Sequence, residues 1–248
     1  MDAGTGCGRH AGSLVRNHRC LRTGLRQASQ YQRVPEDFYD LEIHTVPAGQ
    51  EKQEVYLQGR QEGARAREYE DALQWLVDAR LVHKIYRSCA PGLPVAAYDD
   101  LSAFKIYLVD VGLLRRLALL APTAFGEGNR LFTEFKGALT ENFVLQTLVT
   151  QFEVVPRYWT QINPPYEVDF LIQRENDIIP VEIKSETNTT SKSLKKFKEL
   201  FPDQVKLRVR FSLDNLKLDD DMLNIPLFLA DQADRLIGLA LELRKGVM

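Results

Sequence analysis

The chain has 248 residues, of which 44% are hydrophobic and 27% are charged, and its formal net charge is −2. This composition is typical of a globular protein with one or two modest cores, and it excludes a strongly basic molecule, so any contact with nucleic acid would depend on local basic patches. No apolar run approaches the roughly 20 residues that a membrane-spanning helix needs, so we expect no membrane partner. The three cysteines are scattered without the spacing of a zinc site or a disulfide framework, which fits a cytoplasmic location.

Residues 1–62 show no sustained apolar periodicity and carry many arginines with few acids. Such a segment fits a transit peptide, an arm that binds RNA weakly, or a disordered stretch, and its composition favours disorder. The string "GTGCGRH" near the start lacks the Lys-Ser/Thr pair of a phosphate loop, and no complete phosphate-loop motif occurs in the chain. We therefore expect a poorly ordered segment over residues 1–62 and no ATP hydrolysis by this polypeptide.

Residues 63–118 have a clearer pattern. The string "REYEDALQWLVDAR" predicts an amphipathic helix, with Tyr69, Leu73, Leu76 and Val77 facing inward. Two strand-like strings, "LVHKIYR" and "FKIYLVD", flank a Pro/Gly-rich stretch, "APGLPVAAYDD". This order of helix, strand, wing and strand predicts a winged-helix-like α+β unit. Its many acidic residues favour a role in packing over a role in DNA binding.

Residues 119–133 are expected to be a linker, and residues 134–248 a second domain. This domain opens with "EFKGALTENFVLQTLVTQFE", which has helical periodicity. Glu141 lies on the flank of the apolar stripe that contains Leu145 and Leu148, where a charge without a partner is costly. Glu141 is therefore either an inward-leaning acid with a partner or an ordinary acid on the helix surface.

The string "EVDFLIQRENDIIPVEIKSE" predicts a β-hairpin, because two apolar runs flank a short polar stretch. A two-residue turn at its Glu-Asn dipeptide would pair Phe170 with Val181 and Asp169 with Glu182. Side chains alternate between the two faces of a strand. One face is then apolar and consists of Val168, Phe170, Ile172, Ile179, Val181 and Ile183. The other face carries Glu167, Asp169, Glu182 and Lys184.

Two carboxylates that face each other across a strand pair have Cβ atoms roughly 5 Å apart. At an effective dielectric of about 20, their charges repel each other by about 3 kcal/mol. Lys184 supplies one compensating charge, and a divalent cation such as Mg²⁺, which binds through one or two carboxylates, would supply two. The alternative is a solvated polar strand edge with an ordinary ion pair.

Downstream, "SETNTTSKSLKKFKELFP" predicts a helix that buries Leu194, Phe197 and Phe201, and "VKLRVRF" predicts a strand. The helix has basic residues at Lys192, Lys195 and Lys196. Because they follow the acidic residues directly, they are candidates to guide the phosphate backbone of DNA. A solvated helix face is the alternative.

The order of these residues resembles the PD-(D/E)xK nuclease superfamily. The matching positions are Glu141 in the first helix, Asp169 in "EVDF", and Glu182 and Lys184 in "VEIK". The resemblance implies an α/β fold with a restriction-endonuclease-like mixed sheet flanked by helices. It also implies that Asp169 and Glu182 hold Mg²⁺, that Glu141 ligates it directly or through water, and that Lys184 positions and activates the attacking water.

The chain also resembles a narrower family over roughly residues 50–235. The strings from "GARAREYEDALQWLVDARLVHKIYR" through "FKGALTENFV" to "VEIK" are similar to the domain of unknown function that follows the P-loop module in AAA-superfamily ATPases of bacteria and archaea. This resemblance implies a nuclease-like part of an ATPase, with DNA and an ATPase module as partners. Hydrolysis of DNA and a non-catalytic role in DNA binding or assembly both remain open.

The resemblance leads to an expectation for the N-terminus as well. Members of this family carry a large ATPase module before the winged helix, whereas "HTVPAGQEKQEVYLQGRQ" here is polar, Gln-rich and aperiodic. We therefore expect the chain to be a C-terminal remnant of a longer ATPase gene, with a disrupted reading frame shortly before Gly63. Translation of the neighbouring frames of the upstream DNA would test this.

Overall fold

The computed structural model describes residues 41–48, 52–59, 70–118, 120, 130–185 and 190–245. The chain divides into two compact units, of which one contains helix α2 (Glu70–Asp78) and the other contains residues 43–58 and everything from Ala79 onward. Leu73 and Leu76 of α2 are buried, as predicted. Tyr69, predicted on the same stripe, lies outside the described residues.

Strands β1 (Leu41–Ala48) and β2 (Lys52–Gly59) form a two-stranded sheet. Both strands fall within residues 1–62, for which we expected poor order. The string "EVYL" in β2 contains a β-branched and an aromatic residue, which favour strands. Polar and Gln-rich flanks concealed this signal in the sequence.

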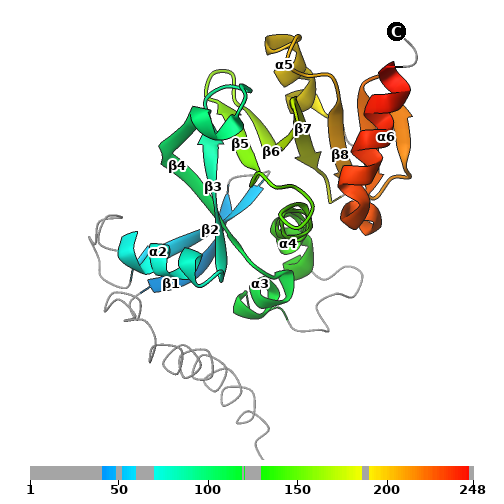
Figure 1. Cartoon of the computed structure of the whole chain (residues 1–248). Coiled ribbons are helices and arrows are strands. Elements are labelled where there is room, and N and C mark those ends of the chain that lie inside the picture. Colours follow the sequence, from blue (N-terminus) through cyan, green and yellow to red (C-terminus); the bar gives the residue numbers. More distant parts are fainter. Residues whose placement is uncertain are drawn as a thin grey trace, which may run out of the picture. The chain divides into compact units, whose positions relative to one another are not determined.

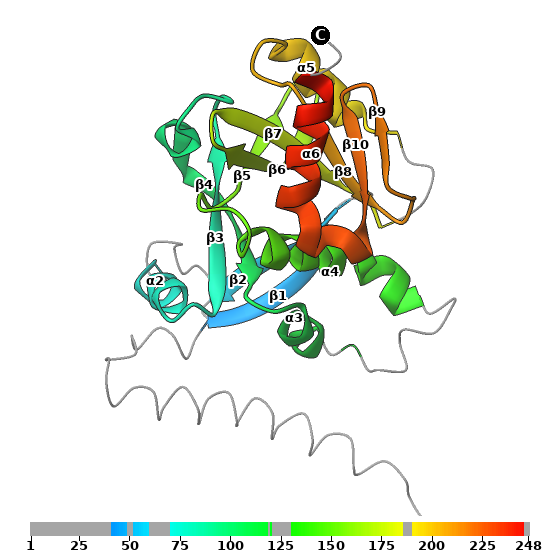
Figure 2. The same ribbon diagram turned by 45° about the vertical axis from the view of Figure 1, so that its right-hand side comes forward.

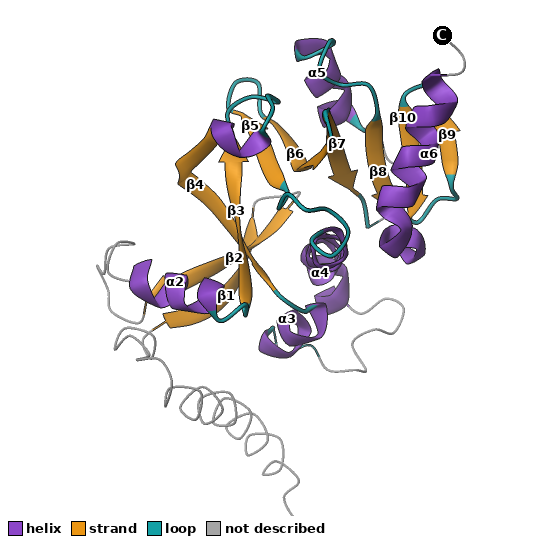
Figure 3. Ribbon diagram, viewed as in Figure 1, coloured by secondary structure: helices purple, strands orange, loops and turns teal. Residues whose placement is uncertain are grey.

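The second unit is built on an eight-stranded mixed sheet, with strand order β4-β3-β5-β6-β7-β8-β10-β9 (Figures 1 and 3). Its strands are β3 (Val82–Ser88), β4 (Asp99–Leu108), β5 (Arg157–Gln161), β6 (Tyr166–Arg174), β7 (Asp177–Ile183), β8 (Arg208–Ser212), β9 (Lys217–Asp219) and β10 (Met222–Pro226). The pairs β3–β5, β7–β8 and β8–β10 are parallel, and the other neighbours are antiparallel. The prediction of a mixed α/β sheet is confirmed. The strands β3 and β4, expected in a separate unit, lie in the same sheet as the later strands.

Helices cover both faces of this sheet. They are α3 (Val111–Leu117), α4 (Arg130–Leu148), α5 (Lys192–Leu200) and α6 (Ala233–Lys245), with the 3-10 helices η3 (Val95–Tyr98) and η5 (Leu227–Gln232). Figure 2 shows α6 running along the sheet beside β10. No helix in the described part of the chain is long and apolar enough to span a bilayer.

Among the described residues, one large apolar cluster lies on each face of the sheet. Residues of α4 and α6 pack with the first cluster, which includes Leu145, Phe170 and Val181. The second cluster joins Leu194 and Phe197 of α5 to sheet residues that include Leu171 and Ile178. Neighbouring residues such as Phe170 and Leu171 thus belong to opposite clusters, as strand alternation requires. The apolar stripe of α5 was predicted from its helical spacing, whereas the apolar residues of the sheet that it covers were not predicted.

The predicted register of the hairpin is confirmed where β6 pairs with β7. Phe170 lies opposite Val181, and the pairing continues to Arg174 opposite Asp177. Glu175 in the turn has φ 52°, a left-handed conformation that tight hairpins require. A one-residue slip would have moved the apolar residues to the wrong face, so the pattern alone was sufficient to fix the pairing.

The prediction that Val168 lies on the same face of the hairpin as Phe170 is wrong. The register between β5 and β6 shifts, because Arg157 pairs with Leu171 whereas Trp159 pairs with Val168. Strand β6 therefore has one extra residue at this point, a bulge that reverses the alternation of faces. As a result, Val168 packs in the second cluster with Trp159 and Leu171, and not with Phe170.

Asp221 ties β8 to α5 through a buried charge cluster. It is 4% exposed and accepts hydrogen bonds from the Arg208 guanidinium, with the Nε atom at 3.0 Å, and its carboxylate lies 3.5 Å from Lys198 Nζ. Burial alone would raise the pKa of Asp221, but Arg208 and Lys198 lower it below the ordinary value. The carboxylate is therefore charged at neutral pH.

Asp221→Asn should lower the free energy of unfolding by about 2 kcal/mol at pH 7, because it leaves two partly buried cations without their anion. The folded-state pKa is the lower one, so the stabilising contribution is present above the unfolded pKa of about 4 and is lost as the pH falls below it. Urea unfolding at pH 7 and pH 3 should show a difference between variant and wild type that shrinks in acid. Asp219→Asn, in a surface pair with Lys217, is the control and should change little. A penalty that does not depend on pH would contradict the charge assignment.

Candidate functional site

Asp169 lies on β6 beyond the last backbone pair with β7. The β6–β7 pairing ends with Phe170 opposite Val181, and the Asp169 Oδ2 atom accepts a hydrogen bond from the Ile183 backbone N–H at 2.7 Å. The carboxylate is therefore held at the point where the two strands separate. The Asp169 residue is 2% exposed, so it is a buried acid within β6.

Glu182 has one satisfied and one unsatisfied carboxylate oxygen. Its Oε1 atom lies 2.8 Å from Lys184 Nζ, whereas Oε2 is buried and has no hydrogen-bond partner within the described part of the chain. The residue is 5% exposed and pairs in register with Arg210 of β8. A buried acceptor without a partner costs about 1–3 kcal/mol, more when it is charged. Native structures avoid such atoms unless a ligand or a functional role accounts for them.

Lys184 follows the last residue of β7 and is fixed through its backbone. Its N–H donates to the Phe211 carbonyl of β8 at 2.8 Å, which continues the parallel pairing past the strand end. The side chain is 30% exposed, so its ammonium can contact both Glu182 and a ligand that arrives from solvent. Asp169, Glu182 and Lys184 thus lie at the same end of neighbouring strands.

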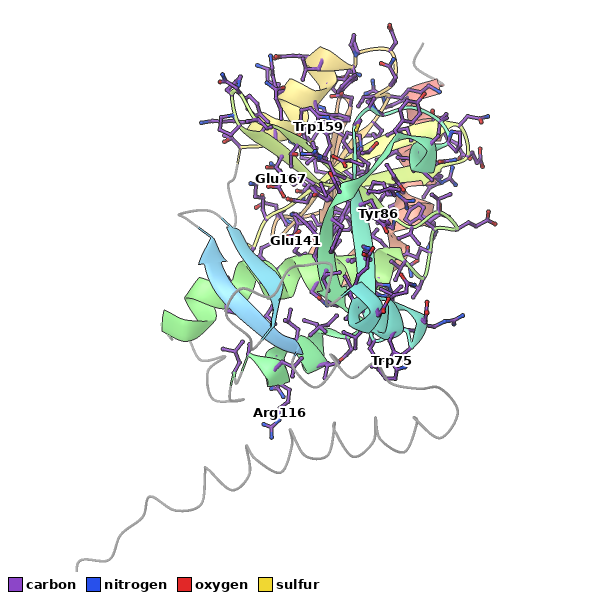
Figure 4. The ribbon with its side chains drawn as sticks, turned by 90° about the vertical axis from the view of Figure 1, so that its left-hand side faces the viewer. Trp75, Tyr86, Arg116, Glu141, Trp159 and Glu167 are labelled. Carbon is purple, nitrogen blue, oxygen red and sulfur yellow. The ribbon has the colours of Figure 1, made fainter. Side chains whose placement is uncertain are left out.

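Glu141 projects from α4 and is held by two side chains of β4. Its Oε1 atom accepts a hydrogen bond from the Tyr107 hydroxyl and lies 3.4 Å from Lys105 Nζ. Lys105 Nζ also lies 2.5 Å from Glu167 Oε1 and 5.2 Å from the centre of the Tyr158 ring. Glu141 and Glu167 are labelled in Figure 4. The prediction of Glu141 as an inward acid with a partner is the alternative that the structure supports.

The acidic side chains around Lys105 and Tyr107 shift the pKa values of both residues. Burial alone would lower the pKa of Lys105, but the negative groups Glu141, Glu167 and Asp169 raise it well above its ordinary value. Lys105 is therefore a permanent cation. Burial, and then the charge of Glu141, raise the pKa of Tyr107 well above the ordinary value. Tyr107 therefore keeps its proton and serves as a hydrogen-bond donor.

Sequence reasoning missed Lys105 and Tyr107, and gave Glu167 no role. The string "FKIYLVD" was interpreted as a strand, but nothing in it showed that β4 would lie across from α4. One signal was available, because Lys105 and Tyr107 are two residues apart and therefore share a face. A lysine on the same strand face as a buried aromatic residue needs an acidic partner.

The basic residues predicted to contact DNA lie on α5. Lys192 and Lys195 are exposed, and Lys196 forms an ion pair with Glu199 at 3.5 Å. The neighbouring Lys198 serves the structure instead, because it donates to the Val205 carbonyl and contacts Asp221. Contact between the first three lysines and a phosphate backbone stays a prediction.

The donor groups fit a magnesium ion in part. Mg²⁺ prefers carboxylate oxygens and usually takes one or two of them together with waters. Asp169 and Glu182 are two of the ligands that the sequence predicted, and the partnerless Glu182 Oε2 is an atom that a bound cation would satisfy. The Glu141 oxygen, by contrast, is occupied by Tyr107 and Lys105. Across the described residues no group of three His, Cys, Asp or Glu side chains is placed to hold a metal ion.

Fold and site together define a mixed α/β protein with buried carboxylates on β6 and β7 and a lysine that follows β7. Two family models match the chain, each over less than half of its length. Residues 136–228 match the Domain of unknown function (DUF4143), and residues 27–124 match the Domain of unknown function (DUF8612). No curated protein and no solved structure matches the chain.

The residues of the candidate site fall in two different family matches. Glu141, Asp169, Glu182 and Lys184 fall in the DUF4143 match, whereas Lys105 and Tyr107 fall in the DUF8612 match. The second match also runs without a break across Gly63. This continuity gives no support to the expected frame disruption before that residue.

Proposed function

We propose that the chain is a nuclease-like module that hydrolyses a DNA phosphodiester with the help of Mg²⁺. The observation that carries the proposal is the buried, partnerless Glu182 Oε2 atom beside the Lys184 ammonium, at the strand end that also holds Asp169. The proposal includes the PD-(D/E)xK-like assignment of residues 134–248 and the winged-helix-like assignment of residues 63–118. An ATPase module is the proposed protein partner.

In this proposal Asp169 and Glu182 hold the ion, which when bound would polarise a phosphoryl oxygen and lower the pKa of a bound water. Glu141 would join them only after release from its present partners. Lys184 orients the attacking water and offsets the negative charge that develops on the phosphorus oxygens. The water oxygen forms a new P–O bond, and the bond to the leaving sugar oxygen breaks. The exposed Lys192 and Lys195, with Lys196, hold the DNA backbone.

A second candidate function is a non-catalytic module that binds DNA or assembles an ATPase. One observation favours it: Lys105 already forms ion pairs with Glu141 and Glu167, so part of their negative charge is compensated without a metal ion. In that case the buried charges fix the packing of β4 against α4 and do no chemistry.

Nicking of supercoiled plasmid distinguishes the two functions. The wild-type protein should nick DNA in the presence of Mg²⁺ or Mn²⁺. Addition of a chelator should stop the nicking. Glu182→Ala should remove the activity, and Lys184→Met should reduce it by about 100-fold or more while the ion still binds. Lys217→Met is the matched control, because Lys217 is 68% exposed and paired with Asp219 on the edge strand β9.

Two outcomes would count against hydrolysis at this site. Equal nicking by wild type and Glu182→Ala would place the activity elsewhere. Absence of nicking in a wild-type protein that binds Mn²⁺ and DNA would favour the non-catalytic function.

A further inference from the structure

A pocket of about 280 Å³ lies where α3, α4 and η5 meet. Most of its wall comes from α3 and α4, which Figure 1 shows next to each other. The apolar part of the lining consists of Val111 of α3, Leu139 and Phe143 of α4, and Leu227 of η5. Small-molecule sites span roughly 300–1,000 Å³, so this pocket fits a small ligand. Among the described residues that line it, none belongs to the proposed catalytic site.

Two side chains of α4 fix the start of α3 and with it the pocket. The Asn142 side chain accepts a hydrogen bond from the Leu108 backbone N–H at 2.9 Å and donates one to the Leu108 carbonyl at 3.0 Å. One turn later, Gln146 Oε1 accepts a hydrogen bond from the Val111 backbone N–H at 2.8 Å. Asn142 and Gln146 are four residues apart and therefore share a face of α4. A pocket whose walls are fixed in this way loses less conformational freedom when a ligand binds.

Two cations and no acid lie among the described residues that line the pocket. The cations are Arg115 of α3 and Lys136 of α4. The remaining polar side chain is Thr140, whose hydroxyl donates to the Lys136 carbonyl at 2.7 Å and so has its proton engaged within the helix. A lining of apolar side chains and two positive charges matches a ligand that is apolar along its length and negative at one end.

We propose that this pocket binds a small amphiphilic carboxylate, namely a hydrocarbon chain that ends in a carboxylate group. The chain packs against Leu139, Phe143 and Leu227. The carboxylate contacts the Arg115 guanidinium, whose parallel N–H groups match its two oxygens, and the Lys136 ammonium is a second donor. The inference goes beyond the proposed hydrolysis of DNA and does not depend on it, because the two sites share no residue.

Calorimetric titration of the full chain with hexanoate, octanoate and octylammonium tests the class of ligand. Each methylene that enters the pocket should tighten binding roughly fourfold, so octanoate should bind about tenfold more tightly than hexanoate. Octylammonium has a chain of the same length but the opposite charge, and it should bind at least about tenfold more weakly than octanoate. Absence of octanoate binding, or equal affinity for octanoate and octylammonium, would overturn the proposal.

Thr140→Phe tests the place of binding, because the phenyl ring should fill the pocket. The affinity for octanoate should fall at least about tenfold. The matched control is Thr150→Phe, at an exposed position just beyond the end of α4 and outside the pocket, where the threonine hydroxyl likewise donates to a backbone carbonyl. This control should bind octanoate as the wild-type protein does. Equal affinity in the wild-type protein and folded Thr140→Phe would place the binding elsewhere and refute the pocket as the site.

Arg115→Met tests the charge contact and also serves if Thr140→Phe fails to fold. Loss of the guanidinium should weaken octanoate binding roughly tenfold, and the preference for octanoate over octylammonium should shrink with it. Arg116→Met is the control, because Arg116, labelled in Figure 4, is the exposed next residue of α3 and does not line the pocket. Equal losses in the two variants would mean that the general positive charge of α3 acts, and would contradict a contact at Arg115.

Discussion

Glu182→Ala should abolish Mn²⁺ binding in a calorimetric titration and yet change the free energy of unfolding by less than about 1 kcal/mol. The first effect follows because the substitution removes one of the two carboxylates that we propose as ligands of the ion, including the Glu182 Oε2 atom, which has no hydrogen-bond partner among the described residues. The second follows because a buried acceptor that lacks a hydrogen bond costs the folded state free energy. Its removal offsets the loss of the Lys184 ion pair, and Lys184 can turn to solvent.

The matched control for this titration is Glu153→Ala, which removes an exposed acid on the connection between α4 and β5. It should bind Mn²⁺ as wild type does. Unchanged Mn²⁺ affinity in Glu182→Ala would remove Glu182 from the ligand set. Unfolding of Glu182→Ala would show that the carboxylate is needed for stability and not for a ligand.

Phe170→Ala should lower the free energy of unfolding by about 4 kcal/mol, the largest loss that we expect from a single substitution here. The Phe170 side chain is 0% exposed in the cluster between the sheet and α4, and its ring lies 5.6 Å from that of Tyr107, centre to centre. Its truncation leaves a cavity that the surrounding strands cannot fill. The substitution also removes the packing that holds Tyr107 against Glu141.

Urea denaturation followed by circular dichroism measures this loss. Phe228→Ala is the control of equal chemistry, because Phe228 is 78% exposed on η5 and its truncation should cost less than about 0.5 kcal/mol. Equal, small effects of the two substitutions would mean that Phe170 is not part of a tightly packed core.

The sequence was sufficient to predict the structure where the pattern lies within a short segment of the chain. The β6–β7 register follows from apolar alternation and a short turn, and both lie within twenty residues of chain. The stripe of α5 follows from helical spacing in the same way, and Leu194 and Phe197 are indeed fully buried. In both cases any other arrangement would expose apolar side chains or bury charges.

Features that depend on distant partners could not be predicted from the sequence. The bulge that reverses Val168 is set by the pairing of β6 with β5, and nothing in "EVDF" marks the extra residue. The contacts of Lys105 with Glu141 and Glu167 span 36 and 62 residues of chain. They require β4 to lie beside α4, an arrangement that results from the whole sheet and that no single segment encodes.

The parallel pairing of β3 with β5 has a consequence for how this protein can be divided. A fragment that starts at residue 134 would keep the matched DUF4143 segment but lose β3 and β4, which would leave β5 at the border of the sheet. Exposed border strands present free backbone groups that recruit strands from other molecules, so such a fragment would tend to self-associate. It would also leave Glu141 without the lysine and tyrosine that hold it. A fragment with an intact site must therefore also include β3 and β4, which lie in the DUF8612 match.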